Sequence, residues 1–302
     1  MTTPIIPYIK NLELTSYCNL NCPICVEKTW KREHLSLELL ETILSKNKEV
    51  FEGQSIWLHY RGDPLLYPQL DIALDMFETY HVRTRLSTNG VLLTPQKIDM
   101  LLHSPLEGLV VSVITDDAEM YKQLRGSDKY ETVRAHVDNL ILAHQALGSH
   151  TKIQVMGLNY GQGVSKIEAF VKHYNNLGVE VAIHRFSDRI NQSRYNPDMK
   201  KPIVSKRLPC KWVFNDIIIL SDCSVTTCYF DLATRNILCN LRDYDYSILE
   251  VWNSETYQRI RAEHNSLHFK GACKDCCDWV YEHPDIDKEI NTFVRIYPTK
   301  HV

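Results

Sequence analysis

Two groups of cysteine residues offer the clearest chemistry in this 302-residue sequence. Cys18, Cys22 and Cys25 follow one another with three and then two residues between them. No cysteine occurs in the next 184 residues, and seven follow between Cys210 and Cys277. In a reducing compartment, clustered thiols favour metal or redox chemistry over disulfide bonds. The distribution therefore predicts two separate cysteine sites.

The first group places three thiolates on one loop, directly after a predicted strand at residues 9–15. The carboxyl ends of parallel strands are where α/β barrels carry their chemistry. A 4Fe–4S cluster has four irons, so three thiolates leave one iron free to hold another group. The spacing favours a catalytic cluster of this kind. The alternative is a zinc site completed by His34 or His59.

The Cys18-x3-Cys22-x2-Cys25 loop resembles the signature of the radical S-adenosylmethionine (radical SAM) superfamily. The resemblance implies that the open iron binds the amino and carboxylate groups of SAM. An electron from the cluster would then cleave SAM to a 5′-deoxyadenosyl radical, which takes a hydrogen atom from substrate. It also implies an external one-electron reductant of the flavodoxin or ferredoxin type.

Further short motifs resemble the SAM-binding positions of this family. Tyr60-Arg61-Gly62-Asp63-Pro64 is similar to its Gly-Gly-Glu-Pro motif, with arginine replacing the first glycine and Asp63 replacing glutamate. A carboxylate here would meet the methionine ammonium group, with a reach shorter by one methylene. The cofactor-binding residues that the resemblance implies are Tyr60, Gly62, Asp63, Ser87, Asn89, Ser112 and Arg125. Without the cysteine loop, Asn89-Gly90 would be an ordinary turn and Arg125 a solvated charge.

The second group pairs Cys210-x17-Cys228 with Cys273-x2-Cys276. It resembles the Twitch domain, the single-cluster relative of the SPASM domain, in which four cysteines ligate an auxiliary 4Fe–4S cluster. Residues 248–255 support this because they are similar to the family's Ile-Trp-Asn-Ser helix. The full seven-cysteine SPASM pattern is absent. The alternative is a zinc ribbon that holds a small domain together.

Cys223, Cys239 and Cys277 have no ligand role in this scheme. Each could be a buried small apolar residue or a hydrogen-atom donor to a substrate radical. Cys277 could also replace Cys276 as a cluster ligand.

The elements that must position these residues follow a β–α alternation, which is typical of a parallel sheet. Predicted strands lie at residues 9–15, 55–60, 82–87, 108–114, 151–156 and 180–186, and predicted helices at 36–52, 69–80, 95–103, 129–147 and 166–177. The pattern predicts an α/β fold with a partial (β/α)6 barrel over residues 1–186.

The pattern changes after residue 186. Residues 187–209 carry mixed charge and several prolines, which indicates a linker. The resemblance implies that residues 210–302 form a small α+β Twitch/SPASM-like domain with its C-terminal tail. Its predicted elements are a hairpin at 214–230 and a helix capped by Asn253 or Ser254.

The composition limits the classes of partner that this protein can be expected to bind. The net charge of −3 gives no global field that attracts nucleic acid or anionic lipid. No apolar run approaches ~18 residues and the N-terminus lacks a secretory signal, so we expect a cytoplasmic protein with no membrane partner.

The resemblance also suggests a reaction. Enzymes with Twitch domains commonly act on small polyols or aminosugars, whereas SPASM relatives more often modify peptides through an extra leader-binding domain. Only 17 residues precede Cys18 and 25 follow Cys277, which favours a small substrate. Arg185, Tyr229 and His184 are the residues we expect to hold it, although Arg185 could equally be a surface charge.

Oxidation is the favoured outcome, because the auxiliary cluster can take a second electron from the substrate radical. The alternatives are a radical epimerase that uses a cysteine donor, a peptide-modifying enzyme, and a non-enzymatic zinc or iron–sulfur module. No Gly-rich phosphate loop, Ser-based elbow or HExxH helix supports a hydrolase or kinase.

Overall fold

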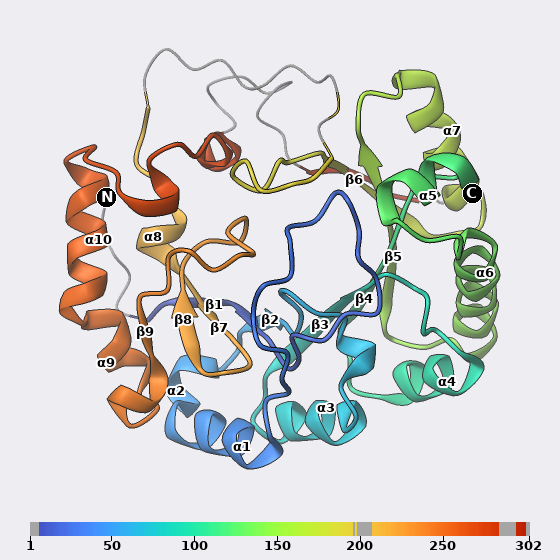
Figure 1. Ribbon diagram of the computed structural model, residues 1–302. Coiled ribbons are helices and arrows are strands. Elements are labelled where there is room, and N and C mark those ends of the chain that lie inside the picture. Colours follow the sequence, from blue (N-terminus) through green and yellow to red (C-terminus); the bar gives the residue numbers. More distant parts are fainter. Residues whose placement is uncertain (1–5, 196, 198–206, 284–293, 300–302) are drawn as a thin grey trace.

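A curved parallel sheet organises the protein, for which the computed structural model describes residues 6–195, 197, 207–283 and 294–299. Six of its parallel strands stand side by side in chain order, as predicted (Figure 1). They are β1 (Tyr8–Leu12), β2 (Ser55–Trp57), β3 (Arg83–Thr88), β4 (Gly108–Ile114), β5 (Lys152–Asn159) and β6 (Glu180–Arg185). The α/β partial barrel is confirmed. The first two strands end three residues earlier than expected, because the chain there turns into the loops that carry the cysteines and the Asp63 motif.

Helices cover the outer face of this sheet (Figure 1). They are α1 (Leu37–Lys46), α2 (Lys48–Phe51), α3 (Leu70–Thr79), α4 (Pro95–His103), α5 (Ala118–Arg125), α6 (Tyr130–Leu147) and α7 (Val164–Asn176), with a 3-10 turn, η1 (Pro64–Leu66). In α6 the residues Val133, Val137, Leu140 and Ile141 are buried, as their helical spacing predicts. No helix of the described ranges is both long and apolar enough to cross a membrane.

Two helices differ from the prediction. The helix expected at 36–52 is interrupted at Asn47, whose side-chain amide donates to the carbonyls of Ile43 and Tyr246 and accepts from the backbone N–H of Ile248. Helix α5 was not predicted, because it is short and buries only Tyr121, Leu124 and Arg125.

The sheet continues without a break into the C-terminal part of the chain. After the short helix α8 (Trp212–Asn215), strand β7 (Asp216–Ile219) pairs parallel with β1. Strands β8 (Ser224–Thr226) and β9 (Cys239–Asn240) follow antiparallel, and β10 (Val294–Tyr297) adds antiparallel to β6. The hairpin is confirmed, but Phe214 lies in α8 rather than in a strand.

A small helical layer completes the C-terminal part. It contains η2 (Leu241–Tyr244), α9 (Ile248–Asn253), α10 (Glu255–Asn265), η3 (Gly271–Cys273) and η4 (Asp278–Glu282). Ser254 is the N-cap of α10, accepting from the backbone N–H of Tyr257. The guanidinium of Arg261 lies 4.0 Å from the ring centroid of Trp252, which packs α10 against α9.

The segment expected as a linker is packed where the structure describes it. The backbone N–H groups of Arg194 and Tyr195 both donate to the carbonyl of Pro23, inside the first cysteine loop. The hydroxyl of Ser187 donates to Oδ1 of Asp278, 2.9 Å away, at the second cysteine group. Residues 187–195 therefore bridge the two cysteine sites rather than simply joining two domains.

Gly157 tests how tightly the barrel packs. A Cβ atom on this residue would lie 2.7 Å from Cδ1 of Ile183 and 2.8 Å from Cε1 of Phe170. We expect Gly157→Ala to lower the free energy of unfolding by about 1–3 kcal/mol, measured by urea denaturation. Gly108→Ala is the matched control, because its Cβ would meet nothing closer than 3.6 Å. Equal losses in both variants would contradict this account.

Candidate active site

The loops at the carboxyl edge of the sheet enclose one cavity. Its lining includes every cofactor-binding, first-group and substrate-holding residue predicted from the sequence: Cys18, Cys22, Cys25, Tyr60, Gly62, Asp63, Ser87, Asn89, Ser112, Arg125, His184, Arg185 and Tyr229. These residues come from the loops after β1 and β2, from β3 and the loop after it, from β4, from helix α5, from β6 and from the C-terminal part. The fold thus brings together side chains that are up to 211 positions apart in the sequence.

Asp63 connects the loop after β2, to which it belongs, with the loop after β3. Its carboxylate accepts from the backbone N–H of Leu65 at 3.0 Å, from Oγ1 of Thr88 at 2.9 Å and from the backbone N–H of Asn89 at 2.8 Å. The side-chain amide of Asn89 in turn donates to Oδ1 of Asn19, within the cysteine loop, at 2.7 Å. Burial raises the pKa of Asp63, although these donors favour its charged form. Asn89 is thus more than an ordinary turn residue.

Gly62 is required by a close approach of two loops. A Cβ atom here would lie 2.2 Å from the carbonyl oxygen of Thr15 and 2.5 Å from that of Tyr17. The next backbone N–H, that of Asp63, donates to the Tyr17 carbonyl at 2.8 Å. Only glycine lets the Asp63 loop lie directly against the residue that precedes Cys18.

Arg125 is buried beside the cysteine loop, so its interpretation as a solvated charge is wrong. Its Nη2 donates to the hydroxyl of Ser112 at 2.6 Å, and its Nη1 lies 3.8 Å from Sγ of Cys22. Burial acts to lower the pKa of Arg125, but the neighbouring Cys22, Tyr121 and Cys18 together outweigh it and the pKa is raised. Its Nε is buried without a hydrogen-bond partner, which suits a site that accepts a further anionic group.

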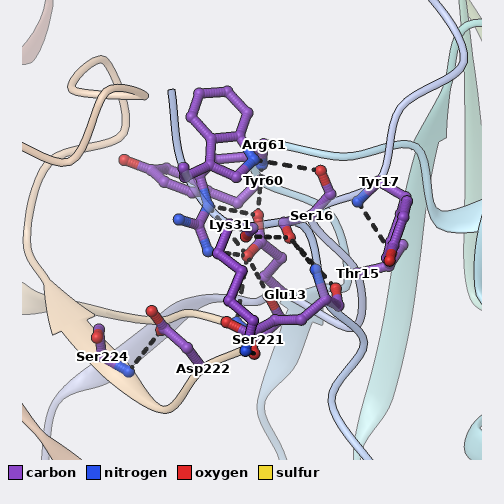
Figure 2. A network of polar contacts seen from close by, with 12 residues as sticks. Glu13, Thr15, Ser16, Tyr17, Lys31, Tyr60, Arg61, Ser221, Asp222 and Ser224 are labelled. Carbon is purple, nitrogen blue, oxygen red and sulfur yellow. Dashed lines mark hydrogen bonds and ion pairs between the residues drawn. The ribbon is translucent and has the colours of Figure 1, made fainter. Parts of the chain in front are cut away.

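A buried ion pair joins the cavity to the C-terminal hairpin (Figure 2). The Arg61 guanidinium lies 2.6 Å from Oε2 of Glu13, with side-chain exposures of 3% and 0%. The Arg61 backbone N–H donates to Oε1 at 2.7 Å, and the Ser221 hydroxyl donates to Oε2 at 2.9 Å. Arg61 also packs over the ring of Trp30, 5.5 Å from its centroid. Sequence reasoning missed Glu13, although a carboxylate inside an apolar strand was the available signal.

Tyr60 makes a second connection to the same part of the chain. Its hydroxyl donates to the backbone carbonyl of Cys228 at 2.6 Å and lies 3.0 Å from that of Asp231. Burial raises the pKa of this phenol well above its usual value, so it remains a donor. Arg61 is thus linked through Glu13 to the β7–β8 turn, and its neighbour Tyr60 contacts the loop of Cys228.

The second cysteine group is gathered in the folded chain. Burial raises the pKa of the Cys228 thiol, and the neighbouring Cys276, Cys210 and Cys273 raise it further. The side-chain amide of Asn236 donates to Sγ of Cys273 at 3.3 Å. Three of the thiols, those of Cys210, Cys228 and Cys276, pack against the apolar residues Ile190, Trp212, Phe230 and Ala272. A metal group bound to these sulfurs would stabilise their thiolate forms at this otherwise unfavourable site.

The arrangement of the thiols bears on the zinc alternatives. A tetrahedral zinc site would bring its sulfurs to within roughly 4 Å of one another. In the part of the chain that the structure describes, no three or more His, Cys, Asp or Glu side chains are arranged to hold a metal ion. This observation applies to an iron–sulfur cluster as much as to zinc, including zinc completed in the first group by His34 or His59, so the arrangement of the thiols does not choose between them.

The three remaining cysteines lie away from the cavity. Cys223 is buried in the β7–β8 turn at a φ of 67°, and Cys239 lies in β9 against the core. Cys277 is exposed. None of the three lines the cavity. A hydrogen donor must reach the reacting carbon, so their placement does not support that role, and the exposed position of Cys277 does not favour it over Cys276 as a ligand.

Comparison with known proteins assigns the family. Residues 12–173 match the Radical SAM superfamily, which is more than half of the chain. The chain belongs to the radical SAM superfamily. Residues 210–277 match the SPASM iron–sulfur cluster-binding domain. The two domains of this radical SAM enzyme imply SAM and more than one 4Fe–4S cluster as cofactors, and the donor sets described above fit both.

Three relatives indicate the range of similar proteins. The S-adenosyl-L-methionine-dependent 2-deoxy-scyllo-inosamine dehydrogenase of Niallia circulans is 27% identical over 143 residues, which are 44% of this chain and 57% of the dehydrogenase. The structure of BtrN in complex with AdoMet and 2-DOIA has a TM-score of 0.59 at 19% identity, covering 91% of this chain and 94% of BtrN. Streptococcus suis SuiB bound to the precursor peptide SuiA has a TM-score of 0.71 at 16% identity, covering 99% and 76%. The matches to the first curated relatives span about half of their lengths, 49–57%.

The Glu13–Arg61 pair gives a stability prediction. We expect Arg61→Met to cost about 3–5 kcal/mol of unfolding free energy, because it leaves the Glu13 carboxylate buried without a cation. Adding Glu13→Gln should recover much of this loss, since the charge is removed as well. Urea denaturation under anaerobic conditions measures both variants. Arg83→Met is the control, because the Arg83 side chain is 60% exposed and its pair with Glu107 should contribute at most about 1 kcal/mol. An Arg61 loss as small as the control's would contradict the account.

Proposed function

We propose that this radical SAM enzyme is an oxidoreductase that abstracts a hydrogen atom from a C–H group of a small polar substrate. The substrate class we favour is a polyol or aminosugar, and the favoured outcome is oxidation. The observation that carries the proposal is the single cavity in which the first cysteine loop and Tyr229 of the C-terminal part both take part. The partial likeness to a dehydrogenase of an aminocyclitol supports the choice of substrate.

Each cysteine group has a proposed ligand role. Cys18, Cys22 and Cys25 would hold a cluster with one open iron, while Cys210, Cys228, Cys273 and Cys276 would fully ligate the auxiliary cluster. When bound, SAM and the first cluster supply a radical that removes a hydrogen atom, and the auxiliary cluster supplies an acceptor for a second electron.

The protein's own side chains bind, orient and exclude water. Asp63 would accept from the SAM ammonium while keeping the Asn89 loop in place, and Arg125 would place positive charge beside the Cys22 thiolate. The guanidinium of Arg194 donates to the carbonyl of Cys22 at 3.1 Å, so residues 187–195 cover the cysteine loop. Such a cover limits access of water to a reactive radical.

The alternatives are less well supported. An epimerase needs a hydrogen donor in the cavity, and within the described ranges Cys223, Cys239 and Cys277 do not line it. The likeness to a peptide-bound structure concerns the fold at 16% identity, so it does not favour a peptide substrate. A non-enzymatic module would leave the convergence of Asp63, Asn89 and Arg125 unexplained. We further propose a cytoplasmic location and an external flavodoxin- or ferredoxin-type reductant.

Cluster content tests the proposal directly. Replacement of Cys18, Cys22 and Cys25 by alanine should leave about four irons per reconstituted chain and abolish SAM cleavage, because only the auxiliary ligands remain. Cys273→Ala is the complementary variant, and it should stop product formation while 5′-deoxyadenosine is still released. Iron and sulfide analysis and chromatography of SAM products measure these outcomes. Stoichiometric zinc in the native protein, or loss of all iron in the triple variant, would falsify the proposal.

The Asp63 carboxylate gives an independent test of SAM binding. Asp63→Asn should weaken SAM binding by about tenfold or more, because it removes a charge-assisted acceptor, while the iron content of both sites stays unchanged. Equilibrium dialysis with labelled SAM measures the affinity. Thr88→Val separates the second role of Asp63, since it removes a loop contact but keeps the carboxylate. Unchanged SAM affinity in Asp63→Asn would remove this residue from the site.

A further inference from the structure

A second cavity, of about 1000 Å³, occupies the interior of the barrel next to the one described above. The two cavities share part of their lining, so they meet at one junction. The shared residues are His59, Ser87, Met156, His184, Arg189 and Tyr229. Three of these six side chains carry a basic nitrogen, and His59 and Arg189 were not among the substrate-holding residues predicted from the sequence.

Two of the basic side chains present unpaired nitrogens. Nδ1 of His59 and Nη1 of Arg189 are both buried and have no hydrogen-bond partner in the protein. The Arg189 guanidinium is held over two aromatic rings, 5.8 Å from the centroid of Tyr229 and 5.4 Å from that of Phe230. Burying a polar nitrogen without a partner is costly, so such atoms indicate a missing acceptor.

The charges around the junction favour a negatively charged acceptor. Burial, with Arg189 and His184 beside it, lowers the pKa of His59 to about 4, and burial with Arg189 lowers that of His184 equally. Burial and neighbouring basic side chains cause both shifts. The positive charge of Arg189 acts to lower the pKa of Asp278, but burial raises this pKa to about 6. Oδ1 of Asp278 already accepts a hydrogen bond from the Ser187 hydroxyl. Both histidines are therefore neutral near pH 7, and Arg189 is the cation that acts on both of them at the junction.

We propose that this junction binds an oxyanion on the substrate, either a carboxylate or a phosphate. Arg189 supplies the charge, and His59, with its proton on Nδ1, donates a hydrogen bond beside it. The inference rests on the proposed function, because it takes the cavity to be the substrate site. It narrows the substrate class to small polar molecules that carry an acidic group. An ammonium group would be repelled at this position, so any amino group of the substrate lies elsewhere.

Anion binding to the intact enzyme tests the assignment without turnover. Protein reconstituted with its clusters and saturated with SAM is titrated anaerobically with inorganic phosphate and, separately, with acetate, using equilibrium dialysis of labelled anion. We expect at least one of the two anions to bind saturably. The anion that binds more tightly shows whether the site prefers a phosphate or a carboxylate. Arg189→Gln should weaken that binding by about tenfold or more, and His59→Phe should weaken it by a smaller factor.

Matched controls separate this inference from the function on which it rests. Arg83→Gln removes an exposed arginine outside both cavities and should bind the anion as the wild type does. Iron content and the visible absorption spectrum confirm that each variant is folded. SAM cleavage by the wild type is assayed in parallel, so loss of that activity would refute the proposed function alone. No saturable binding of either anion, equal binding by Arg189→Gln, or release of SAM by the anion would each overturn the oxyanion site.

Discussion

The carboxylate of Glu13 is the constraint on which the arrangement of this protein depends. A fully buried charge is costly by several kcal/mol unless it is paired and hydrogen-bonded. Here its two oxygens accept from the backbone and guanidinium of Arg61 and from the backbone and hydroxyl of Ser221. These donors come from the β2 loop and the β7–β8 turn, while Glu13 itself follows β1. Satisfying one carboxylate therefore brings three segments of the chain to a single point.

That point lies between the two cysteine sites. The residue before Arg61, Tyr60, holds the carbonyl of Cys228, and the residues after it, Gly62 and Asp63, lie against the first cysteine loop. Parallel pairing of β7 with β1 adds backbone hydrogen bonds to the same junction. The barrel and the SPASM part are thus joined through a shared sheet and a shared loop. A fixed separation suits a reaction in which substrate lies between two redox groups.

Local signals predicted most of the barrel but not its connections. The apolar spacing of Val133, Val137 and Leu140 gave helix α6, and the β-branched runs gave the strands, because both depend on near neighbours in sequence. The pairing of β7 with β1 joins residues that are 208 positions apart at Tyr8 and Asp216, and nothing in either run specifies it. Helix α5 was missed because its exposed face is polar and only three of its eight residues are buried. The packing of residues 187–195 over the first loop was equally hidden, since its proline-rich context is typical of a linker.

The same distinction explains which parts of the site were predictable. Cysteine spacing is local, so both groups were found, and the motif positions that resembled the family all reached the cavity. His59 and Arg189 have no motif of their own, and they meet only because the end of β2 and the segment after β6 close over the same space. Their convergence gives the cavity two unlike ends. Asp63 supplies a carboxylate beside the cysteine loop, whereas Arg189 supplies a guanidinium beside Tyr229. In the proposed arrangement, the SAM ammonium is held at the Asp63 end and the acidic group of the substrate at the Arg189 end, which orients the substrate relative to SAM. Such an orientation would hold one face of the substrate towards the first cysteine loop, and selectivity for a single C–H group requires this.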